Sequence, residues 1–436
     1  MRRIIVISAI GVVIGGLLIS GMVISRSADR TILAIAAESE SETFLVETLE
    51  RDVRIYDSFG QHRSGEAGDL ATTDWLEERL QSIGYSVSRL SFTVPTTAVR
   101  SSTLVIEDMI FETFPQFPVT PTPTGGVSGH VFSIDEAPQD WTNRIAFVEI
   151  EGNRRTSSLM QADYLAVINS AARSGASAVI VMIRSECGAY KELNAPIDLD
   201  PWPVPVVLLG DRDADAILLA ISSGTSVQLF LESEAVDLEA FNLVAQIGPT
   251  DAPPIIVSTP QSGWFYNASE RGSGIAVFLA LAEWAAAQPD QHFMFVANSG
   301  HERSNLGAHH FMEEVAPEPD ETAFWLHIGA NVGASELDGL STPANSRYLM
   351  VNLNNLPRSW ALFRGQPGYG RPIPLELGLA QGELGAYHEA GYRPLAGVFG
   401  AGPYHHCLND RPNTVSYTAT RDAALSLAGT LQQVLQ

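Results

Sequence analysis

The order of apolar and polar residues divides the chain into regions with different predicted elements. The first region is an uncharged apolar run from Ile4 to Ile24, which as a helix would be about 30 Å long and could cross a bilayer. Apolar residues then recur at helical spacing over 42–59 and 70–83, and the second stretch meets Gly84, a typical helix cap. Alternating β-branched and polar residues predict strands at 85–94 and 103–106.

A stretch rich in Pro, Thr and Gly, 114–126, is the first candidate domain boundary. Beyond it, the run RIAFVEI (144–150) predicts a buried strand, followed by a helix over 157–173 and a second buried strand over 178–183. A further strand, VPVVLLG, precedes a helix over 214–222. The region therefore predicts a compact body of its own.

From Ala240 onward, strands and helices alternate. Short apolar strands such as PIIVS, HFMFVANSG and FWLHIGAN are separated by helices predicted over 272–288 and 302–314. This alternation favours an α/β fold with a largely parallel mixed sheet that is sandwiched by helices. In such sheets ligands bind outside the carboxyl ends of the strands, so we expect the functional site there.

Composition narrows the function classes. The 436 residues carry a formal net charge of -24, and 45% of them are hydrophobic, which describes an acidic chain able to bury two or three cores. Fifty acidic side chains against 26 basic ones would repel phosphate, so a nucleic-acid partner is excluded. The sequence does not indicate an oligomeric state.

The N-terminal apolar run predicts the compartment. Arg2 and Arg3 precede it and should stay in the cytoplasm. The nearest small-x-small cleavage site, 34–36, lies roughly ten residues past the run, farther than in most cleaved signal peptides. We therefore expect an uncleaved single-pass anchor (1–30), a tether (31–40) and an extracytoplasmic remainder; secretion after cleavage is the alternative.

The region 127–235 resembles the protease-associated domain, a small β-rich insert. The segments IAFVEI, AARSGASAVIVM and PWPVPVVLLG follow that domain's order of strand, helix with strand, and strand. The resemblance implies an insert over 114–238 between two parts of one main domain, 41–113 and 239–436.

Most of 41–436 resembles metallopeptidase family 28, the aminopeptidase-type zinc exopeptidases. In that family two zincs are held by a His-x-Asp motif, by the Asp of Asp-Asn-x-Ser-Gly, by the second residue of a Glu-Glu pair, by a later Asp and by a late His. Two such cations can polarise a carbonyl and make hydroxide from water, with a Glu as general base. The resemblance implies a zinc-exopeptidase fold with peptide substrates.

Several of the family's functional positions hold other residues here. Thr259 and Gln261 stand in place of His-x-Asp, and Ala330 stands in place of the later Asp. Thr and Gln are not plausible zinc ligands, and Ala has no donor atom. His301 replaces the general base, a role for which it is a doubtful candidate.

Three of the family's ligand positions remain able to bind a metal. Glu270 stands at the position of the family's bridging Asp, and Glu302 stands at the position of the second Glu of the pair. His406 stands at the position of the late His, and Asp410 follows it at the family's spacing. Two carboxylates and one imidazole could hold one zinc, as glutaminyl cyclases of similar fold do with Asp, Glu and His. We expect zero or one ion, not two. His327 is a weaker substitute ligand.

Each of these residues also has a purely structural interpretation. Glu302 could stabilise the N-terminus of its helix, and His406 could be a half-buried imidazole bonded to Asp410. Cys407 is expected to be a free thiol lining a pocket, and a disulfide with Cys187 in an oxidising compartment is the alternative.

These residues favour a membrane-anchored protein that has lost two-zinc catalysis and binds a peptide or protein ligand. The alternative is a single-metal exopeptidase or a glutaminyl-cyclase-like enzyme.

Overall fold

The computed structural model describes residues 41–436 apart from 137–139, 338–342, 345, 353 and 355–361. The predicted anchor (1–30) and tether (31–40) lie outside the described residues. In the part of the chain that is described, no helix is both long and apolar enough to cross a membrane.

The helices and strands follow one another much as the apolar pattern predicts. The α-helices among the described residues are α2 (Val46–Ser58), α3 (Ala67–Ile83), α4 (Tyr164–Ala172), α5 (Ala214–Ser223), α6 (Ser273–Ala286), α7 (Leu306–Glu314), α9 (Gly382–Glu389) and α10 (Tyr417–Val434). The strands are β1 (Ser86–Ile106), β2 (Met109–Pro115), β3 (Val127–Ser133), β4 (Arg144–Glu151), β5 (Ala178–Arg184), β6 (Val206–Leu209), β7 (Ser226–Ile247), β8 (Ile255–Pro260), β9 (Phe293–Asn298), β10 (Phe324–Ile328), β11 (Arg347–Val351), β12 (Ile373–Pro374) and β13 (Leu395–Gly400). Gly84 ends α3 with a φ of 109°, which confirms the predicted cap.

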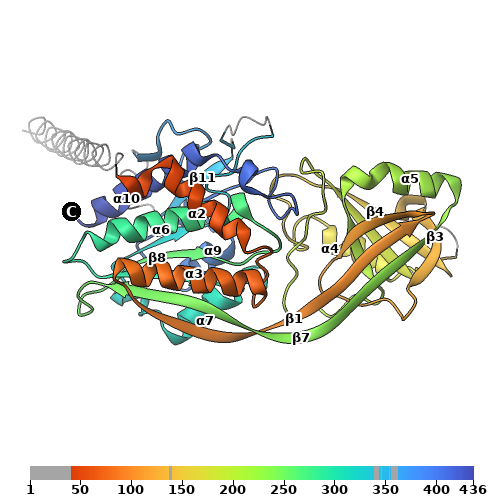
Figure 1. Ribbon diagram of the computed structural model, residues 1–436, viewed down its shortest axis with the longest axis horizontal. Coiled ribbons are helices and arrows are strands. Elements are labelled where there is room, and N and C mark those ends of the chain that lie inside the picture. Colours follow the sequence, from red (N-terminus) through yellow and green to blue (C-terminus); the bar gives the residue numbers. More distant parts are fainter. Residues whose placement is uncertain (1–40, 137–139, 338–342, 345, 353, 355–361) are drawn as a thin grey trace, which may run out of the picture.

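Two long strands connect the two bodies of the molecule. β1 and β7 pair antiparallel from Ser86 opposite Gln246 to Ile106 opposite Val227, and Figure 1 shows them as one curved ribbon that runs from one body into the other. The two strands predicted at 85–94 and 103–106 are therefore one strand. The strand continues through the residues between these two ranges because β7 pairs with β1 along most of its length.

The distal ends of the ribbon close a barrel. β1, β2, β6, β5, β4, β3 and β7 pair in that order, and β7 pairs back onto β1. β5 is the central parallel strand, and every residue from Ala178 to Ile183 is buried, as expected for a strand covered on both faces. The barrel encloses a separate hydrophobic core with α4 and α5 packed against it.

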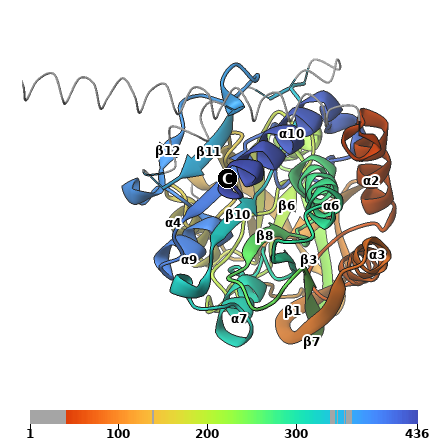
Figure 2. The same cartoon turned by 90° about the vertical axis from the view of Figure 1, so that its left-hand side faces the viewer.

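The proximal half of β7 begins the sheet of the helical body, in the order β7-β9-β8-β10-β13-β11-β12. β9, β8, β10 and β13 are mutually parallel. Alternate residues face opposite layers: Val257 packs with α2, α3, α6 and α10, whereas Ile256 packs with α7 and α9. Figure 2 shows these two groups of helices on opposite faces of the sheet. The predicted α/β fold with a helix-flanked sheet is confirmed, whereas the domain boundaries stay predictions.

Candidate functional site

The candidate residues lie at one edge of the sheet because each follows the carboxyl end of a parallel strand. Glu270 and Arg271 lie in a π-helical turn, Ala268–Gly272, between β8 and α6. The loops after β9, β10 and β13 carry the other side chains: His301, Glu302, Ala330, Asn331, His405 and His406.

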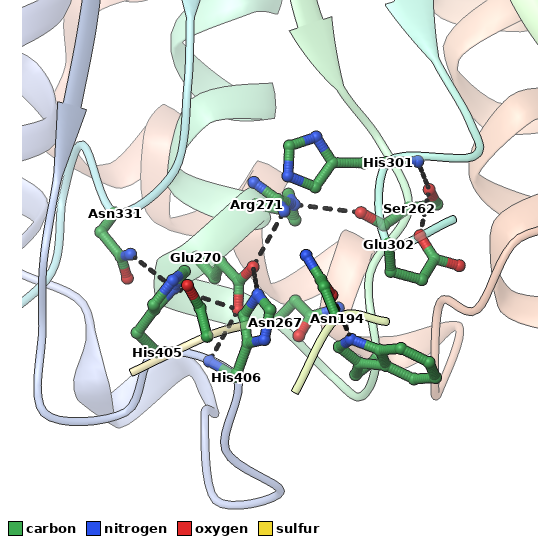
Figure 3. Close-up of polar contacts among 12 residues, drawn as sticks. Asn194, Ser262, Asn267, Glu270, Arg271, His301, Glu302, Asn331, His405 and His406 are labelled. Carbon is green, nitrogen blue, oxygen red and sulfur yellow. Dashed lines mark hydrogen bonds and ion pairs between the residues drawn. The ribbon is translucent and has the colours of Figure 1, made fainter. Parts of the chain in front are cut away.

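A buried ion pair occupies the centre of the site (Figure 3). The Nη2 atom of Arg271 lies 2.9 Å from Oε1 of Glu270, and both side chains are 1% exposed. The Nε atom of Arg271 donates to the backbone oxygen of Ser262 at 3.0 Å, while its Nη1 has no hydrogen-bond partner within the described part of the chain. Oε1 of Glu270 also lacks a well-aligned hydrogen bond, so its contact with Arg271 is an ion pair without hydrogen-bond geometry.

The charge state of Glu270 depends on that guanidinium. Burial opposes ionisation of Glu270, but His406, Arg271 and His405 together hold its pKa well below its ordinary value. Burial lowers the pKa of His406 to about 3, so this imidazole is neutral at pH 7 and supplies no charge there. Arg271 is the cation that persists at neutral pH.

His406 turns one ring nitrogen toward the Glu270 carboxylate. Its Nδ1 lies 2.9 Å from the backbone oxygen of Glu192, so the neutral ring carries its proton on Nδ1 and leaves a lone pair on Nε2. That Nε2 lies 3.5 Å from Oε1 of Glu270, and the backbone N–H of His406 donates to Oε2 at 2.9 Å. Two acceptors therefore face each other, an arrangement that suits a cation between them.

His405 completes a group of three potential metal ligands. Its Nδ1 lies 3.5 Å from Oε2 of Glu270 and 2.9 Å from Nδ2 of Asn331. Ligand atoms of Glu270, His405 and His406 all lie within 4.8 Å of one another. Among the described residues, this is the one group of three potential metal ligands that lie so close together. His405 thus takes the place in this group that the sequence assigned to Glu302. The doubled histidine in YHHC was the available signal.

Glu302 lies apart from that group. Its Oε1 accepts hydrogen bonds from the backbone N–H and the hydroxyl of Ser64 at 2.7 and 2.6 Å, and its Oε2 accepts from Ser262 at 2.9 Å. In Figure 3, Arg271 lies between Glu302 and Glu270. The carboxylate of Glu302 is therefore already engaged in holding two loops together.

Thr259 and Gln261, which the resemblance aligns with metal-site positions of the family, form hydrogen bonds in the interior of the protein. The Thr259 hydroxyl donates to the backbone oxygen of Ile328 at 2.9 Å. Nε2 of Gln261 donates to Asp69 at 2.9 Å and to Thr73 at 2.7 Å. Ala330, at the position where the resemblance implies a carboxylate, has only a methyl side chain.

His301 has a carboxylate partner that the sequence did not indicate. Its Nδ1 lies 3.2 Å from Oε1 of Glu383, a fully buried side chain in α9. Burial opposes ionisation of Glu383, yet the hydrogen bond from His301 and the nearby His327 keep its pKa below the ordinary value. Asn298 donates to the other oxygen of Glu383 at 3.0 Å. No sequence spacing links residues 301 and 383, so only the fold could show this pair.

Asp410 fixes the turn that carries Glu270. Its carboxylate accepts the backbone N–H groups of Ser269 and Glu270 at 2.8 and 2.9 Å and the Thr414 hydroxyl at 2.6 Å. Burial raises the pKa of Asp410 to about 6. The predicted partnership of Asp410 with His406 is replaced by these contacts.

The barrel covers the loop that carries the two histidines. Cys187 and Cys407 form a disulfide with a Cα–Cα distance of 6.6 Å, so the expectation of a free Cys407 is wrong. The physical reason is a backbone bridge between Lys191 and Cys407, beside which the N–H of Glu192 donates to the oxygen of His406 at 3.1 Å. These contacts bring the two sulfurs together.

Comparisons with known proteins agree with this architecture. Residues 254–368 match the model of peptidase family M28, which confirms the predicted resemblance. A search of curated protein sequences finds no match.

Solved structures of two aminopeptidases and of a peptidase precursor share the fold. The zinc aminopeptidase from Bacillus subtilis has a TM-score of 0.69 and 16% identity, covering 89% of this chain and 94% of that one. A peptidase M28 precursor from Shewanella amazonensis has a TM-score of 0.68 and 17% identity, covering 95% and 97%. An aminopeptidase from Aneurinibacillus sp. strain AM-1 has a TM-score of 0.61 and 18% identity, covering 91% and 95%.

Proposed function

We propose that the protein is a relative of the zinc aminopeptidases that has lost two-zinc hydrolysis and binds a peptide or protein ligand, held at the outer face of a membrane by its N-terminal segment. In this proposal the chain is a pseudoenzyme, and the edge of the sheet that carried catalysis serves recognition.

The buried Arg271–Glu270 pair carries this proposal. A guanidinium 2.9 Å from the carboxylate at the bridging position is a fixed positive charge where the family holds two cations. Like charges at such short range in a poorly solvated site repel strongly. Thr259 and Ala330 supply no replacement ligands, and Glu302 is committed to Ser64 and Ser262. These residues do not fit a two-zinc centre.

A polypeptide ligand is supported by the fold and by the barrel. The structures with the same fold are named as aminopeptidases, whose substrates are peptides. The barrel, which resembles a protease-associated domain, extends over the site: the indole N–H of Trp264 donates to Asn194 at 2.6 Å. A ligand at this edge would contact both bodies, which is typical of sites between two domains.

Extracytoplasmic placement is supported by the disulfide. Disulfides persist in oxidising compartments and are rare in the cytosol. The Cys187–Cys407 bond therefore agrees with the orientation that Arg2 and Arg3 predict for the apolar run.

The test combines metal content with hydrolysis and binding. A soluble form beginning at Thr31 would be saturated with zinc, desalted and analysed for bound metal, then assayed with aminoacyl-nitroanilides and with a fluorescent peptide library. We expect fewer than two zincs per chain, flat progress curves and saturable peptide binding. Two zincs per chain, or the absence of binding to every peptide, would contradict the proposal.

A single-metal site is the second candidate, and the close approach of Glu270, His405 and His406 favours it. A zinc bound there would act as a Lewis acid on a carbonyl group. His406 would bind through the Nε2 lone pair that the Glu192 carbonyl leaves free, and Asn331 would orient His405. Such a site suits an exopeptidase or a cyclase.

Two matched variants separate the candidates. For a single-metal enzyme, Glu270→Gln should abolish binding of one zinc per chain, whereas Glu302→Gln should retain it because Glu302 lies outside the group. Chelator-sensitive hydrolysis that disappears in Glu270→Gln would establish the enzyme. A metal content of zero in the wild type would exclude it and leave the binding protein.

A further inference from the structure

A pocket of about 420 Å³ lies between the barrel and the loop that carries the two histidines. The barrel supplies most of its wall, and Pro403 of the histidine loop supplies the rest. It is distinct from the group formed by Glu270, His405 and His406, none of which lines it.

The arginines of this pocket already have partners. Arg154 lies 2.6 Å from Glu186 and 2.6 Å from Glu336. Arg184 lies 2.5 Å from Glu149. Their positive charges are therefore neutralised within the protein.

Lys191, which also lines the pocket, is the single lysine in the sequence and has no ion-pair partner among the residues that the structure describes. Its side chain is buried, with the residue 1% exposed, and its Nζ donates a hydrogen bond to the backbone oxygen of Asn153 at 3.5 Å. No carboxylate among the described residues forms an ion pair with it within 4 Å. A buried cation without a counter-ion is costly, and such groups are usually paired or serve a ligand.

The ammonium form of Lys191 persists at neutral pH. Burial lowers its pKa to about 8, while Glu270, Glu186 and Asp211 act at longer range in the opposite sense. At pH 7 most molecules therefore carry the charge.

We propose that this pocket binds a small organic carboxylate, with one carboxylate oxygen accepting a hydrogen bond from Nζ of Lys191. A monoanion is favoured over a phosphate dianion because Glu151 and Glu186 also line the pocket and would repel a second negative charge. The proposal is independent of the proposed function, since it uses none of the candidate metal ligands.

The experiment measures binding to the full-length protein in detergent micelles by calorimetry. The probes are monoanionic acids (acetate and lactate) and a peptide carboxyl terminus (N-acetyl-glycyl-glycine), each compared with its amide. We expect one of the acids to bind and its amide not to bind. The Lys191→Met variant should weaken that binding by roughly 30-fold or more, as loss of a buried charged partner does.

Two controls keep the result interpretable. Lys191→Met should fold with an unchanged or higher melting temperature, because Met fills similar space without a buried charge. Since Lys191 is the only side-chain amine, its modification by an amine reagent can be followed by mass spectrometry, and the bound acid should slow it. Equal binding of acid and amide, unchanged affinity in Lys191→Met, or modification that none of the acids slows would overturn the proposal.

Discussion

Arg271 and Glu270 illustrate how strongly one residue can depend on another in a dry site. Replacing Arg271 with Met leaves the Glu270 carboxylate buried without its cation, and we expect unfolding free energy to fall by about 3–5 kcal/mol. The double variant Glu270→Gln/Arg271→Met should recover much of that loss, because no uncompensated charge remains. Urea denaturation followed by circular dichroism measures both.

The matched control for this pair is on the surface. Arg54 lies 2.6 Å from Glu50 on an exposed face of α2, so Arg54→Met should cost less than about 1 kcal/mol. If Arg271→Met costs no more than Arg54→Met, the buried pair is not the stabilising contact described above.

His62 predicts sensitivity to acid. Its ring stacks on Tyr56 with centroids 3.7 Å apart, and burial lowers its pKa to about 3, below the ordinary value of 6.5. Between pH 6.5 and 3 the unfolded chain binds the proton and the folded chain does not, so stability is full above pH 6.5 and is lost as pH falls.

The variant His62→Phe tests this prediction because Phe keeps the stack and cannot titrate. Its stability at pH 7 should be lower by about 1 kcal/mol, because Phe cannot make the hydrogen bond between Nε2 of His62 and the backbone oxygen of Tyr56 (3.1 Å). Below pH 6.5, however, its unfolding free energy should fall less steeply with falling pH than that of the wild type, by up to about 1.4 kcal/mol per pH unit. Parallel stability curves for the two proteins between pH 6.5 and 4 would contradict the assignment.

Between elements, the disulfide is a covalent contact between residues that lie far apart in the sequence. It joins residues 220 positions apart and ties the barrel to the loop after β13. The double variant Cys187→Ser/Cys407→Ser should lose about 2–5 kcal/mol of stability, mainly because the unfolded chain is no longer constrained. A reducing agent should lower the melting temperature of the wild type and leave the variant unchanged; a wild type indifferent to reductant would contradict the bond.

The elements themselves could largely be predicted from sequence, because their periodicity is local. α3 with its Gly84 cap, the buried β5 and the alternation from β8 to β10 all follow from residues close in the chain. The β1–β7 ribbon could not be predicted, since its two strands are separated by the other strands of the barrel and their central residues mix polar and apolar types.

The sequence predicts where in the fold the site lies, but not which side chains contact one another there. The family resemblance assigns Glu270 and His406 to one site, and their side chains lie 3.5 Å apart, whereas a metal between them stays a prediction. Glu302 kept its position, yet its oxygens are taken by Ser64, 238 residues away in the chain. The partnership of His301 with Glu383 depends on a similar long-range contact between the β9 loop and α9.

At the scale of the whole molecule, the two bodies are joined on two sides. The β1–β7 ribbon joins them along one side, and Cys187–Cys407 joins the barrel to the histidine loop on the site side. Because two separated attachments restrict rotation more than one, we expect the barrel to hold a fixed position over the site while the disulfide is intact.

The geometry of the ribbon would allow the barrel to be deleted from the chain. Ile106 and Val227 are paired across the two strands at its distal end, so the chain leaves and re-enters the ribbon at neighbouring positions. An Asn-Gly turn joining these two residues would convert the ribbon into an ordinary β-hairpin, since that dipeptide suits a tight turn between antiparallel strands. Such a shortened chain should keep the helical body's sheet and expose Trp264 and Phe265, which now pack in the barrel's core. The barrel would then be a module inserted at a hairpin tip, a location where whole domains can be gained or lost without disturbing the sheet beneath.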